Sequence, residues 1–537
     1  MSDWSFVDVW RTIAGVQAGA VALEQGERRW TWGEFAHDFD ALGSYLDALG
    51  LPPQSTVALY MYNSPEYLLG FAGALAAGLV PINTNYRYGE DELRYLFENA
   101  DARVVVFHGA FVERLDTIRA SLTGVVAYVF VDDATSGCPS WAVPFDETLR
   151  ATPRGLAPQS GAALMMLYTG GTTGMPKGVM WRQDDLFVRL NSVGALRYPD
   201  EATLEDVARM LEESDARSSI LPACPLMHGT GLFTSLRVLA EGGRVALLQG
   251  RSYDAFELVE ALERGAIERA VIVGDSFARP LLRVLREYPA RFSLGDLRVI
   301  ASSGAMWSEE IKRGLIEMIP HVLLADAFAS SEALGMGSSV SSKDRTLATA
   351  QFTLGESCRV VAEDGTDVEP GSEQVGQLMV AGRNPLGYYR DEEKSARTFP
   401  VIDGVRYVVP GDMAKLRSDG TLVLLGRGSQ CINTAGEKVF PEEVEESLKT
   451  HPSVADACVV GVSDEHYGQR IVAAVELHPG ESTSEGELIA HVKARLASYK
   501  APRTVRFVAS IGRAVNGKLD YRRHLDEAVN WVASLEA

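Results

Sequence analysis

The residues best suited to bind a ligand lie in a glycine- and threonine-rich segment, residues 168–178. The segment contains four glycines, three threonines and Lys177, and it follows an apolar run at 162–167 that is typical of a buried strand. Glycines let the backbone approach a ligand closely, so that backbone N–H groups and threonine hydroxyls can donate to phosphate oxygens. Lys177 adds positive charge for the outer phosphates. The segment therefore predicts a triphosphate-binding site.

Two alternatives compete with this prediction. A Walker loop needs a lysine followed by serine or threonine at the start of a helix. Here Pro176 precedes Lys177 and Gly178 follows it, which argues against an ordinary P-loop NTPase. On composition alone, the segment could also be a flexible loop with a solvated lysine.

Two further segments place small or polar residues after apolar strands. Residues 225–231 contain His228, whose imidazole could lie over a substrate carboxylate or could fill a packed loop. Residues 302–305 end a strand with small side chains, which leave room for a flat ring but also suit a tight strand–helix turn. The residue types alone leave both alternatives open in each segment.

Two carboxylates and one lysine farther along could serve a nucleotide. Glu332 is sufficient as a protein ligand for Mg²⁺, which takes its other ligands from phosphates and water, although glutamate is also common in the first turn of a helix. Asp412 could accept from both ribose hydroxyls, or it could satisfy its own turn. Lys518, judged by residue type alone, is a solvated surface charge.

Size, charge and cysteine content exclude several functional classes. A chain of 537 residues is too long for one hydrophobic core. The net charge of −21 argues against nucleic acid and anionic membranes as partners. Five scattered cysteines fit neither a disulfide framework nor a zinc site and favour the cytoplasm. The start of the chain lacks a signal-peptide pattern, and the longest apolar stretch, 68–82, is too short to span a bilayer.

Apolar strands alternate with amphipathic helices over residues 20–340, the pattern of parallel sheets with covering helices. The predicted strands are 56–61, 103–107, 126–131, 244–248, 269–273, 298–301, 321–324, 455–462, 471–477 and 504–508, and the predicted helices are 91–99, 256–264, 309–318, 485–496 and a closing helix. Short strands follow over 374–425, with a hairpin turn at Asp419-Gly420. We expect an α/β fold with two domains. Residues 1–428 form a large N-terminal domain of parallel-rich sheets, covering helices and a β-rich subdomain, and 429–537 form a small mobile α+β domain.

In their order along the chain, these motifs resemble those of the adenylate-forming superfamily, which comprises acyl-CoA synthetases, luciferases and peptide-synthetase adenylation domains. Phe328, Ala329 and Ser331 stand for the tyrosine, glycine and threonine of a family motif that ends in Glu332. The resemblance implies ATP, Mg²⁺ and coenzyme A as cofactors, with Glu332 as metal ligand. The implied catalytic residues are Lys518, Glu332, Thr169 and His228. The implied cofactor-binding residues are Thr169, Gly170, Gly171, Thr172, Thr173, Gly174, Lys177, Gly304, Ala305, Asp326, Ala327, Phe328, Ser331, Asp412, Arg427, Gly436 and Lys518.

The same resemblance implies an ATP-dependent acid:CoA ligase that forms an acyl-adenylate and then a thioester. Lys518 would stabilise adenylate formation, after which the small domain would rotate about Ser429 and bring Gly436 to the pantetheine arm. The residues implied to line the acyl pocket are mainly apolar: His228, Leu232, Phe233, Ser276, Phe277, Gly304, Met306 and Trp307. This lining favours a hydrophobic acid. The chain is most similar to bacterial synthetases for fatty or steroid side-chain acids.

Two other functions share these residues. A CoA-independent acyl-AMP ligase that loads a carrier protein would need every adenylation residue. A non-catalytic nucleotide-binding homologue would leave Lys518 and Glu332 idle. The expected partners are a small carboxylic acid, ATP and coenzyme A, without nucleic acid; a homodimer is compatible with the sequence but is not specified by it.

Overall fold

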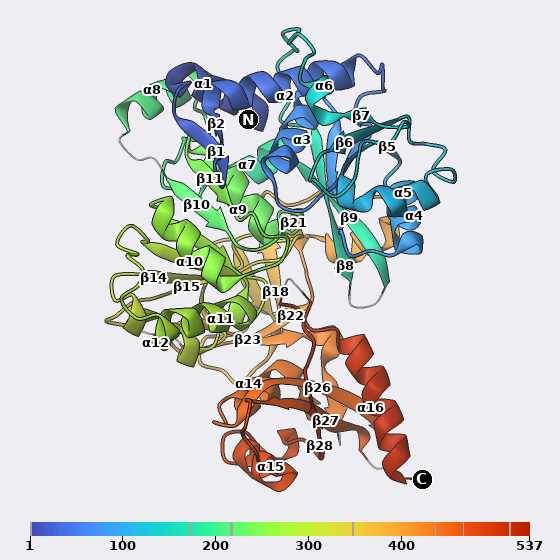
Figure 1. Ribbon diagram of the computed structural model, residues 1–537. Coiled ribbons are helices and arrows are strands. Elements are labelled where there is room, and N and C mark those ends of the chain that lie inside the picture. The colour runs from blue at the N-terminus through green and yellow to red at the C-terminus, as the bar shows by residue number, and fades with distance from the viewer. Residues whose placement is uncertain are drawn as a thin grey trace.

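The computed structural model describes residues 3–171, 174–214, 218–345, 348–434, 437–464, 467–514 and 517–536. Two large β-sheets with covering helices occupy the upper part of Figure 1, and a small sheet from the C-terminal part of the chain lies below them. None of the described helices is both long enough and apolar enough to cross a bilayer.

The first large sheet has eight strands in the order β19-β9-β8-β4-β3-β5-β6-β7. Its strands pair in parallel from β8 to β7. β3 and β4 are buried along their whole length, as expected for parallel strands covered on both faces. The strands are β3 (Thr56–Tyr60), β4 (Val80–Asn83), β5 (Ala102–His108), β6 (Ala127–Val131), β7 (Val143–Pro144), β8 (Leu164–Gly171), β9 (Gly174–Arg182) and β19 (Gly387–Tyr388).

The second large sheet has fifteen strands and changes from parallel to antiparallel along its length. β1, β11, β10, β12, β13 and β14 pair in parallel. From β15 onward the pairing is antiparallel, which forms the expected β-rich part. The strands are β1 (Val21–Gln25), β2 (Arg28–Thr31), β10 (Ser219–Pro222), β11 (Arg244–Leu247), β12 (Arg269–Ile272), β13 (Val299–Ser303), β14 (Leu323–Phe328), β15 (Gly337–Ser341), β16 (Gln351–Leu354), β17 (Cys358–Val361), β18 (Gly376–Ala381), β20 (Val401–Ile402), β21 (Val405–Val408), β22 (Asp412–Leu416) and β23 (Thr421–Arg427).

The C-terminal sheet has five strands and its own apolar clusters on both faces. The strands are β24 (Ile432–Thr434), β25 (Glu437–Val439), β26 (Val454–Asp464), β27 (Gly468–Leu477) and β28 (Thr504–Val508). Helices α14 (Pro441–Lys449) and α16 (Tyr521–Glu536) pack on β26, and α15 (Glu485–Lys493) packs on α14 and β28. Contacts between α14 and β23 show that this sheet lies next to the antiparallel part of the fifteen-stranded sheet.

Two helices of the large sheets begin at residues that are typical of helix N-termini. α3 starts at Pro65, at the first helical position where a missing N–H costs nothing, and it is buried throughout. α10 is capped by Asp254, which accepts from two backbone N–H groups. The helices are α1 (Phe6–Gln17), α2 (Trp32–Asp47), α3 (Pro65–Ala76), α4 (Glu90–Asn99), α5 (Val112–Ile118), α6 (Phe145–Thr148), α7 (Gln183–Asn191), α8 (Leu204–Glu213), α9 (Gly229–Ala240), α10 (Ala255–Arg264), α11 (Gly274–Glu287), α12 (Glu309–Met318) and α13 (Glu392–Thr398).

Most predicted elements are confirmed within a few residues, including the β22–β23 hairpin at Asp419-Gly420. One prediction is incomplete. The sequence suggested a strand ending at Leu167 and a loop after it, but β8 continues to Gly171 and pairs antiparallel with β9 as far as Gly174. The strand continues because β9 supplies backbone partners for residues 164–169 and for Gly171, which a single apolar run cannot reveal. The predicted phosphate segment is therefore the end of a β-hairpin.

Candidate functional site

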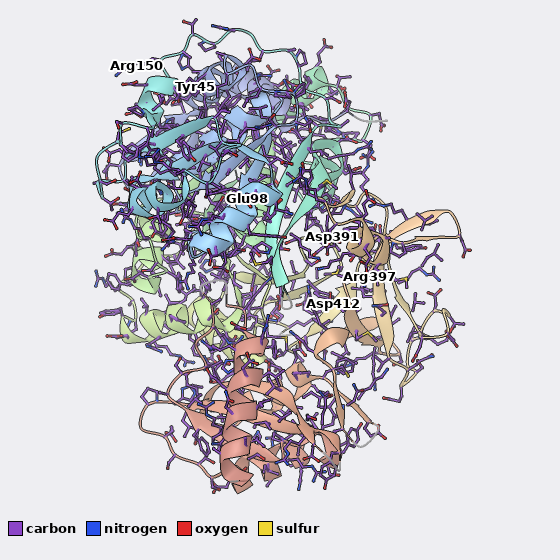
Figure 2. The ribbon with its side chains drawn as sticks, turned by 90° about the vertical axis from the view of Figure 1, so that its right-hand side faces the viewer. Tyr45, Glu98, Arg150, Asp391, Arg397 and Asp412 are labelled. Carbon is purple, nitrogen blue, oxygen red and sulfur yellow. The ribbon has the colours of Figure 1, made fainter. Side chains whose placement is uncertain are left out.

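The hairpin β8–β9 ends beside a cluster of charged residues from a distant part of the chain. Thr169 pairs with Lys177 across the hairpin. The Lys177 ammonium forms an ion pair with Asp391 and lies 5.9 Å from the centroid of the Tyr388 ring. Thr172 and Thr173 lie outside the described residues, so their predicted phosphate contacts stay predictions. Figure 2 shows Asp391 and Asp412 in the region between the large sheets and the C-terminal sheet.

Glu332 is held by a tyrosine next to this cluster. The Tyr388 hydroxyl donates to Glu332 Oε1 at 2.8 Å, and the backbone oxygen of Ser331 accepts from Trp181 Nε1 at 3.0 Å. Burial and the Glu332 charge raise the pKa of Tyr388, so the hydroxyl stays protonated and donates. These contacts fix the position of the half-buried carboxylate.

The donor set fits magnesium rather than a dedicated metal cage. Within the described ranges, no three His, Cys, Asp or Glu side chains converge as metal ligands. A single carboxylate is what Mg²⁺ needs when nucleotide phosphates and water supply the remaining ligands. The residues present are compatible with this ion, and the assignment of Glu332 as its ligand stays a prediction.

Asp412 and Arg427 face each other across the hairpin β22–β23. Arg427 Nε lies 3.7 Å from Asp412 Oδ1, and Asp412 Oδ2 is buried without a hydrogen-bond partner among the described residues. Burial raises the pKa of Asp412, and Arg427 opposes the rise. A buried oxygen without a donor suits a ligand hydroxyl, which agrees with the predicted contact to ribose.

Lys518, in the C-terminal part of the chain, interacts electrostatically with residues of the large sheets. Its side chain is accessible to solvent, yet protein surrounds it so closely that burial is the main cause that lowers its pKa. Arg427 lowers the pKa further, whereas Glu332 and Asp412 raise it. The C-terminal lysine therefore reaches the same region as both predicted nucleotide carboxylates.

The glycine before Lys518 packs directly against the large sheet. Gly517 has a φ of +72°, and a Cβ at this position would lie 2.4 Å from Ser276 Oγ and 3.2 Å from the Val273 oxygen. Only glycine combines this backbone conformation with so close an approach. The segment that follows β28 therefore contacts the start of α11, and we call this contact the closed arrangement.

His228 lies close enough to Lys518 for the charge of the lysine to affect its pKa. It is the residue that precedes α9, and burial, Lys518 and Arg87 lower its pKa to about 3. The imidazole is consequently neutral at physiological pH, so it can hydrogen-bond to a carboxylate without forming an ion pair. Of the predicted catalytic residues, Lys518, Glu332 and His228 thus share one electrostatic environment.

The apolar residues of the predicted acyl pocket on α9 and α11 are buried, and one of them, Phe277, also lines a small pocket. Leu232 and Phe233 are buried on α9, where Phe233 meets Trp181 edge-to-face. Phe277 is buried on α11, and its backbone oxygen accepts from the Tyr253 hydroxyl at 2.8 Å. Phe277 also lines a small pocket with aromatic and polar residues: Tyr62, Asn63, Tyr86, Ala223, Pro225, Leu248, Gly250, Arg251, Ser252 and Tyr253.

In the turn at 303–306, between β13 and α12, there is space beside the backbone of Gly304. Gly304 has a φ of +91°, and Thr230 Oγ1 would lie 3.5 Å from a Cβ at this position. The Met306 oxygen accepts from the Asp275 N–H at 3.0 Å, which fixes the start of α11. Phe328, predicted to hold adenine with Gly304 and Ala305, stacks on Phe352 at 5.5 Å. These adenine contacts stay predictions.

Two predicted site residues have side chains that belong to the core. Lys312, with 0% exposure, forms a 3.0 Å ion pair with Asp326, which is 7% exposed. The Lys312 ammonium also lies 5.5 Å from the centroid of the buried Trp307 ring. The observed contacts of Asp326 and Trp307 are therefore structural. Gly436, predicted to line the pantetheine path, lies outside the described residues.

Removing Asp326 should destabilise the fold, since it leaves the Lys312 charge buried and unpaired. We expect Asp326→Ala to lower the free energy of unfolding by about 3–5 kcal/mol. The double variant Lys312→Met/Asp326→Leu should recover most of this loss because it removes both charges. Urea denaturation measures both effects; a double variant as unstable as Asp326→Ala would contradict the buried-pair explanation.

The sequence reasoning missed residues that support the site from other elements. Tyr388, Asp391 and Lys394 surround Lys177 and Glu332, and burial and Lys177 lower the pKa of Lys394. They lie more than fifty residues beyond Glu332 in sequence and form no compact motif. The antiparallel pairing of β19 with β9 brings them to the hairpin, and no local pattern predicts that pairing.

Glu442 is a further missed residue, at the contact between the two parts of the chain. It lies in the first turn of α14, and a Cβ at Gly426 would lie 2.1 Å from Glu442 Oε2. In the part of the chain that the structure describes, this oxygen is buried without a hydrogen-bond partner. Burial, followed by Glu445 and Asp412, raises the pKa of Glu442 to about 8, while the backbone of Arg427 opposes the rise.

This carboxyl group should make the closed arrangement depend on pH. The raised pKa means that Glu442 binds a proton more tightly in the closed arrangement than it would as a solvated carboxyl group in an open arrangement. The protonated Glu442 therefore stabilises the closed arrangement fully below the ordinary pKa of 4.5, and this stabilisation is lost as the pH rises through about 8. We expect the closed fraction, followed by energy transfer between dyes on the two parts, to fall between pH 7 and 9.

Glu442→Gln should remove most of this pH dependence because glutamine stays neutral. Glu393→Gln, at an exposed position on α13, is the matched control and should keep the wild-type profile. An unchanged profile in Glu442→Gln would contradict the assignment.

Comparison with known proteins adds a family to this geometry. Residues 10–389 match the family model described as AMP-binding enzyme, and residues 443–518 match the model described as AMP-binding enzyme C-terminal domain. The chain is 36% identical over 556 residues to the medium-chain acyl-CoA ligase Mig of Mycobacterium avium, covering 99% of this chain and 100% of that protein. It is 35% identical over 518 residues to a 3-oxocholest-4-en-26-oate–CoA ligase of Rhodococcus rhodochrous, covering 94% and 93%.

Solved structures share the fold. The anthranilate CoA ligase AuaEII in complex with anthranoyl-AMP gives a TM-score of 0.84 at 21% identity, with 99% of both chains covered. ATP-bound MatB from Rhodopseudomonas palustris gives 0.81 at 22% identity, with 99% of both chains covered. These similarities confirm the predicted fold class.

Proposed function

The chain belongs to the AMP-binding enzyme family, and from this premise we propose that it is an ATP-dependent acid:CoA ligase for a hydrophobic carboxylic acid. The observation that carries the proposal is the position of Lys518, which senses the charges of Glu332, Asp412 and Arg427 and lies near His228. The charge of this ammonium is therefore coupled both to the predicted nucleotide carboxylates and to His228 of the predicted acyl site, which supports the proposal.

In the first half-reaction, a carboxylate oxygen of the acid attacks the α-phosphorus of ATP. A P–O bond forms, the bond to the bridging oxygen breaks, and pyrophosphate leaves. Lys518 stabilises the negative charge on the carboxylate and α-phosphate oxygens. Asp412 binds the ribose, neutral His228 orients the acid, and the β8–β9 hairpin with Lys177 contacts the outer phosphates. When bound at Glu332, Mg²⁺ supplies charge neutralisation for the phosphates.

In the second half-reaction, the thiol of coenzyme A gives up its proton and attacks the acyl carbonyl carbon. A C–S bond forms, the C–O bond to phosphate breaks, and AMP leaves. Residues 429–537 rotate as one domain relative to residues 1–428 between the two steps, with the linker at Ser429 as the pivot. The rotation withdraws Lys518 and brings Gly436 to the thiol.

The acid is a medium- or long-chain fatty acid or a steroid side-chain acid. Two points support this class: the relatives named above are ligases for a medium-chain acyl group and for a steroid side-chain acid, and Leu232, Phe233 and Phe277, predicted to line the acyl site, are apolar and buried. The reaction uses small-molecule substrates, and its proposed location is the cytoplasm.

The test supplies purified protein with ATP, Mg²⁺, coenzyme A and a panel of fatty, aromatic and sterol acids. We expect acyl-CoA and AMP to form together with a hydrophobic acid. Adenylate formation without transfer to coenzyme A would instead support a ligase that loads a carrier protein. No AMP with any acid would support a nucleotide-binding protein without catalysis.

A further inference from the structure

Two asparagines from the eight-stranded sheet hold the loop that contains His228. This loop, residues 223–228, follows β10 of the other large sheet. Asn63 lies just beyond β3: its Nδ2 donates to the Cys224 oxygen at 3.0 Å, and its Oδ1 accepts from the Leu226 N–H at 2.7 Å. Asn83 ends β4, and its Nδ2 donates to the Met227 oxygen at 2.7 Å.

Asn83 differs from Asn63 because it also binds the β8–β9 hairpin, which contains the predicted phosphate-binding segment. Its Oδ1 accepts from the Tyr168 N–H at 2.6 Å, and its Nδ2 donates to the Tyr168 oxygen at 2.8 Å. Asn83 is 5% exposed. One planar amide therefore joins the residue before Thr169 to the residue before His228.

Both joined segments depend on this amide for their buried polar groups. Without Asn83, the N–H and oxygen of Tyr168 and the oxygen of Met227 lose hydrogen bonds in a buried setting, where unpaired groups are costly. A rigid amide also transmits a small shift of either segment to the other, because it can keep its three hydrogen bonds only if both segments move together. Among the described residues, the Asn63 side-chain amide contacts only the His228 loop, and its backbone oxygen accepts from Gln25 Nε2.

We propose that Asn83 is a positioning residue that couples the ATP site to the acid site, whereas Asn63 positions the acid site alone. The proposal rests on the proposed function, since it assigns ATP to the hairpin and the acid to the His228 loop. Neither asparagine takes part in bond making. Their effect is on the affinity for substrates, through the backbone of Tyr168 and Met227.

The test compares Asn83→Asp with Asn63→Asp in acid-dependent ATP–pyrophosphate exchange. Each change keeps the shape of the side chain but replaces the donor nitrogen with an oxygen that faces backbone carbonyls. We expect Asn83→Asp to raise the KM for ATP and the KM for the acid, each by roughly tenfold, the effect of weakening one well-formed contact. Asn63→Asp should raise the KM for the acid by a similar factor and leave the KM for ATP unchanged.

A general loss of stability would not produce this difference between substrates in folded enzyme. If Asn83→Asp raised only one KM, or if Asn63→Asp raised both, the coupling role would be overturned. Wild-type enzyme without any acid-dependent exchange would refute the proposed function instead, so the two failures are distinguishable.

Hydrogen exchange on the unmodified protein tests the proposal even if Asn83→Asp does not fold. We expect the acid alone to slow amide exchange in residues 164–171 and a non-hydrolysable ATP analogue alone to slow it in residues 225–233. Protection confined to the segment that each ligand itself contacts would overturn the coupling.

Discussion

Lys518→Ala should lower the rate of acyl-adenylate formation by roughly 10²–10³-fold, the effect of removing one preorganised charge from a developing anion. Burial lowers the pKa of Lys518, but Lys518 lies close enough to Glu332 and Asp412 for their charges to raise it, so its ammonium is near both predicted nucleotide carboxylates. The measurement is acid-dependent ATP–pyrophosphate exchange under saturating substrates. The same variant should convert supplied acyl-AMP and coenzyme A to thioester at close to the wild-type rate.

The contrast between the two half-reactions separates a catalytic role from a structural one. Lys493→Ala, at an exposed position on the same C-terminal part, is the matched control and should leave both rates unchanged. Equal losses in both half-reactions for Lys518→Ala would contradict the proposal that Lys518 is withdrawn before thioester formation.

Glu332→Gln should lower the overall rate by roughly 10²-fold and raise the Mg²⁺ concentration needed for half-maximal rate. Glutamine keeps the size of the side chain and an oxygen that can accept from Tyr388, but it lacks the charge that binds a hard cation. The measurement is a titration of the exchange reaction with MgCl₂ at fixed ATP.

Tyr388→Phe is the control, because it removes the 2.8 Å hydrogen bond to Glu332 and keeps the carboxylate. It should cost less than Glu332→Gln at saturating Mg²⁺. If Glu332→Gln and wild type responded identically to Mg²⁺, the assignment of Glu332 as the metal ligand would be wrong.

The sequence predicted those parts of the fold whose signals are local. The strand at β28 and the helix α12 match their predicted bounds because apolar periodicity and flanking residues define both ends. The hairpin β8–β9 was only half predicted, since its second strand carries a proline and glycines that resemble a loop. Pairing between distant strands, such as β19 with β9, depends on the whole sheet and has no signature in either segment.

The candidate site also contains residues that local motifs predict and residues that only long-range contacts identify. Lys518, Glu332, Asp412 and His228 could be identified because each lies in a short motif whose order resembles that of a known superfamily. In the structure, the charges of Glu332 and Asp412 act on Lys518, and the charge of Lys518 acts on the neutral His228, which sequence spacing alone cannot predict. Asp326 and Trp307 lie in the same motifs, yet their side chains meet Lys312 in the core. Asn83, Tyr388 and Glu442 act through contacts to residues that lie far from them in sequence, so only coordinates identify them.

ATP–pyrophosphate exchange by the wild-type protein tests the central claim most directly. The C-terminal lysine and the glycine–threonine hairpin are proposed to form one adenylating site, so exchange should need ATP, Mg²⁺ and a hydrophobic acid together, and coenzyme A should not be required. Exchange that appears without any acid, or that is absent with every fatty, aromatic and sterol acid in the panel, would contradict it.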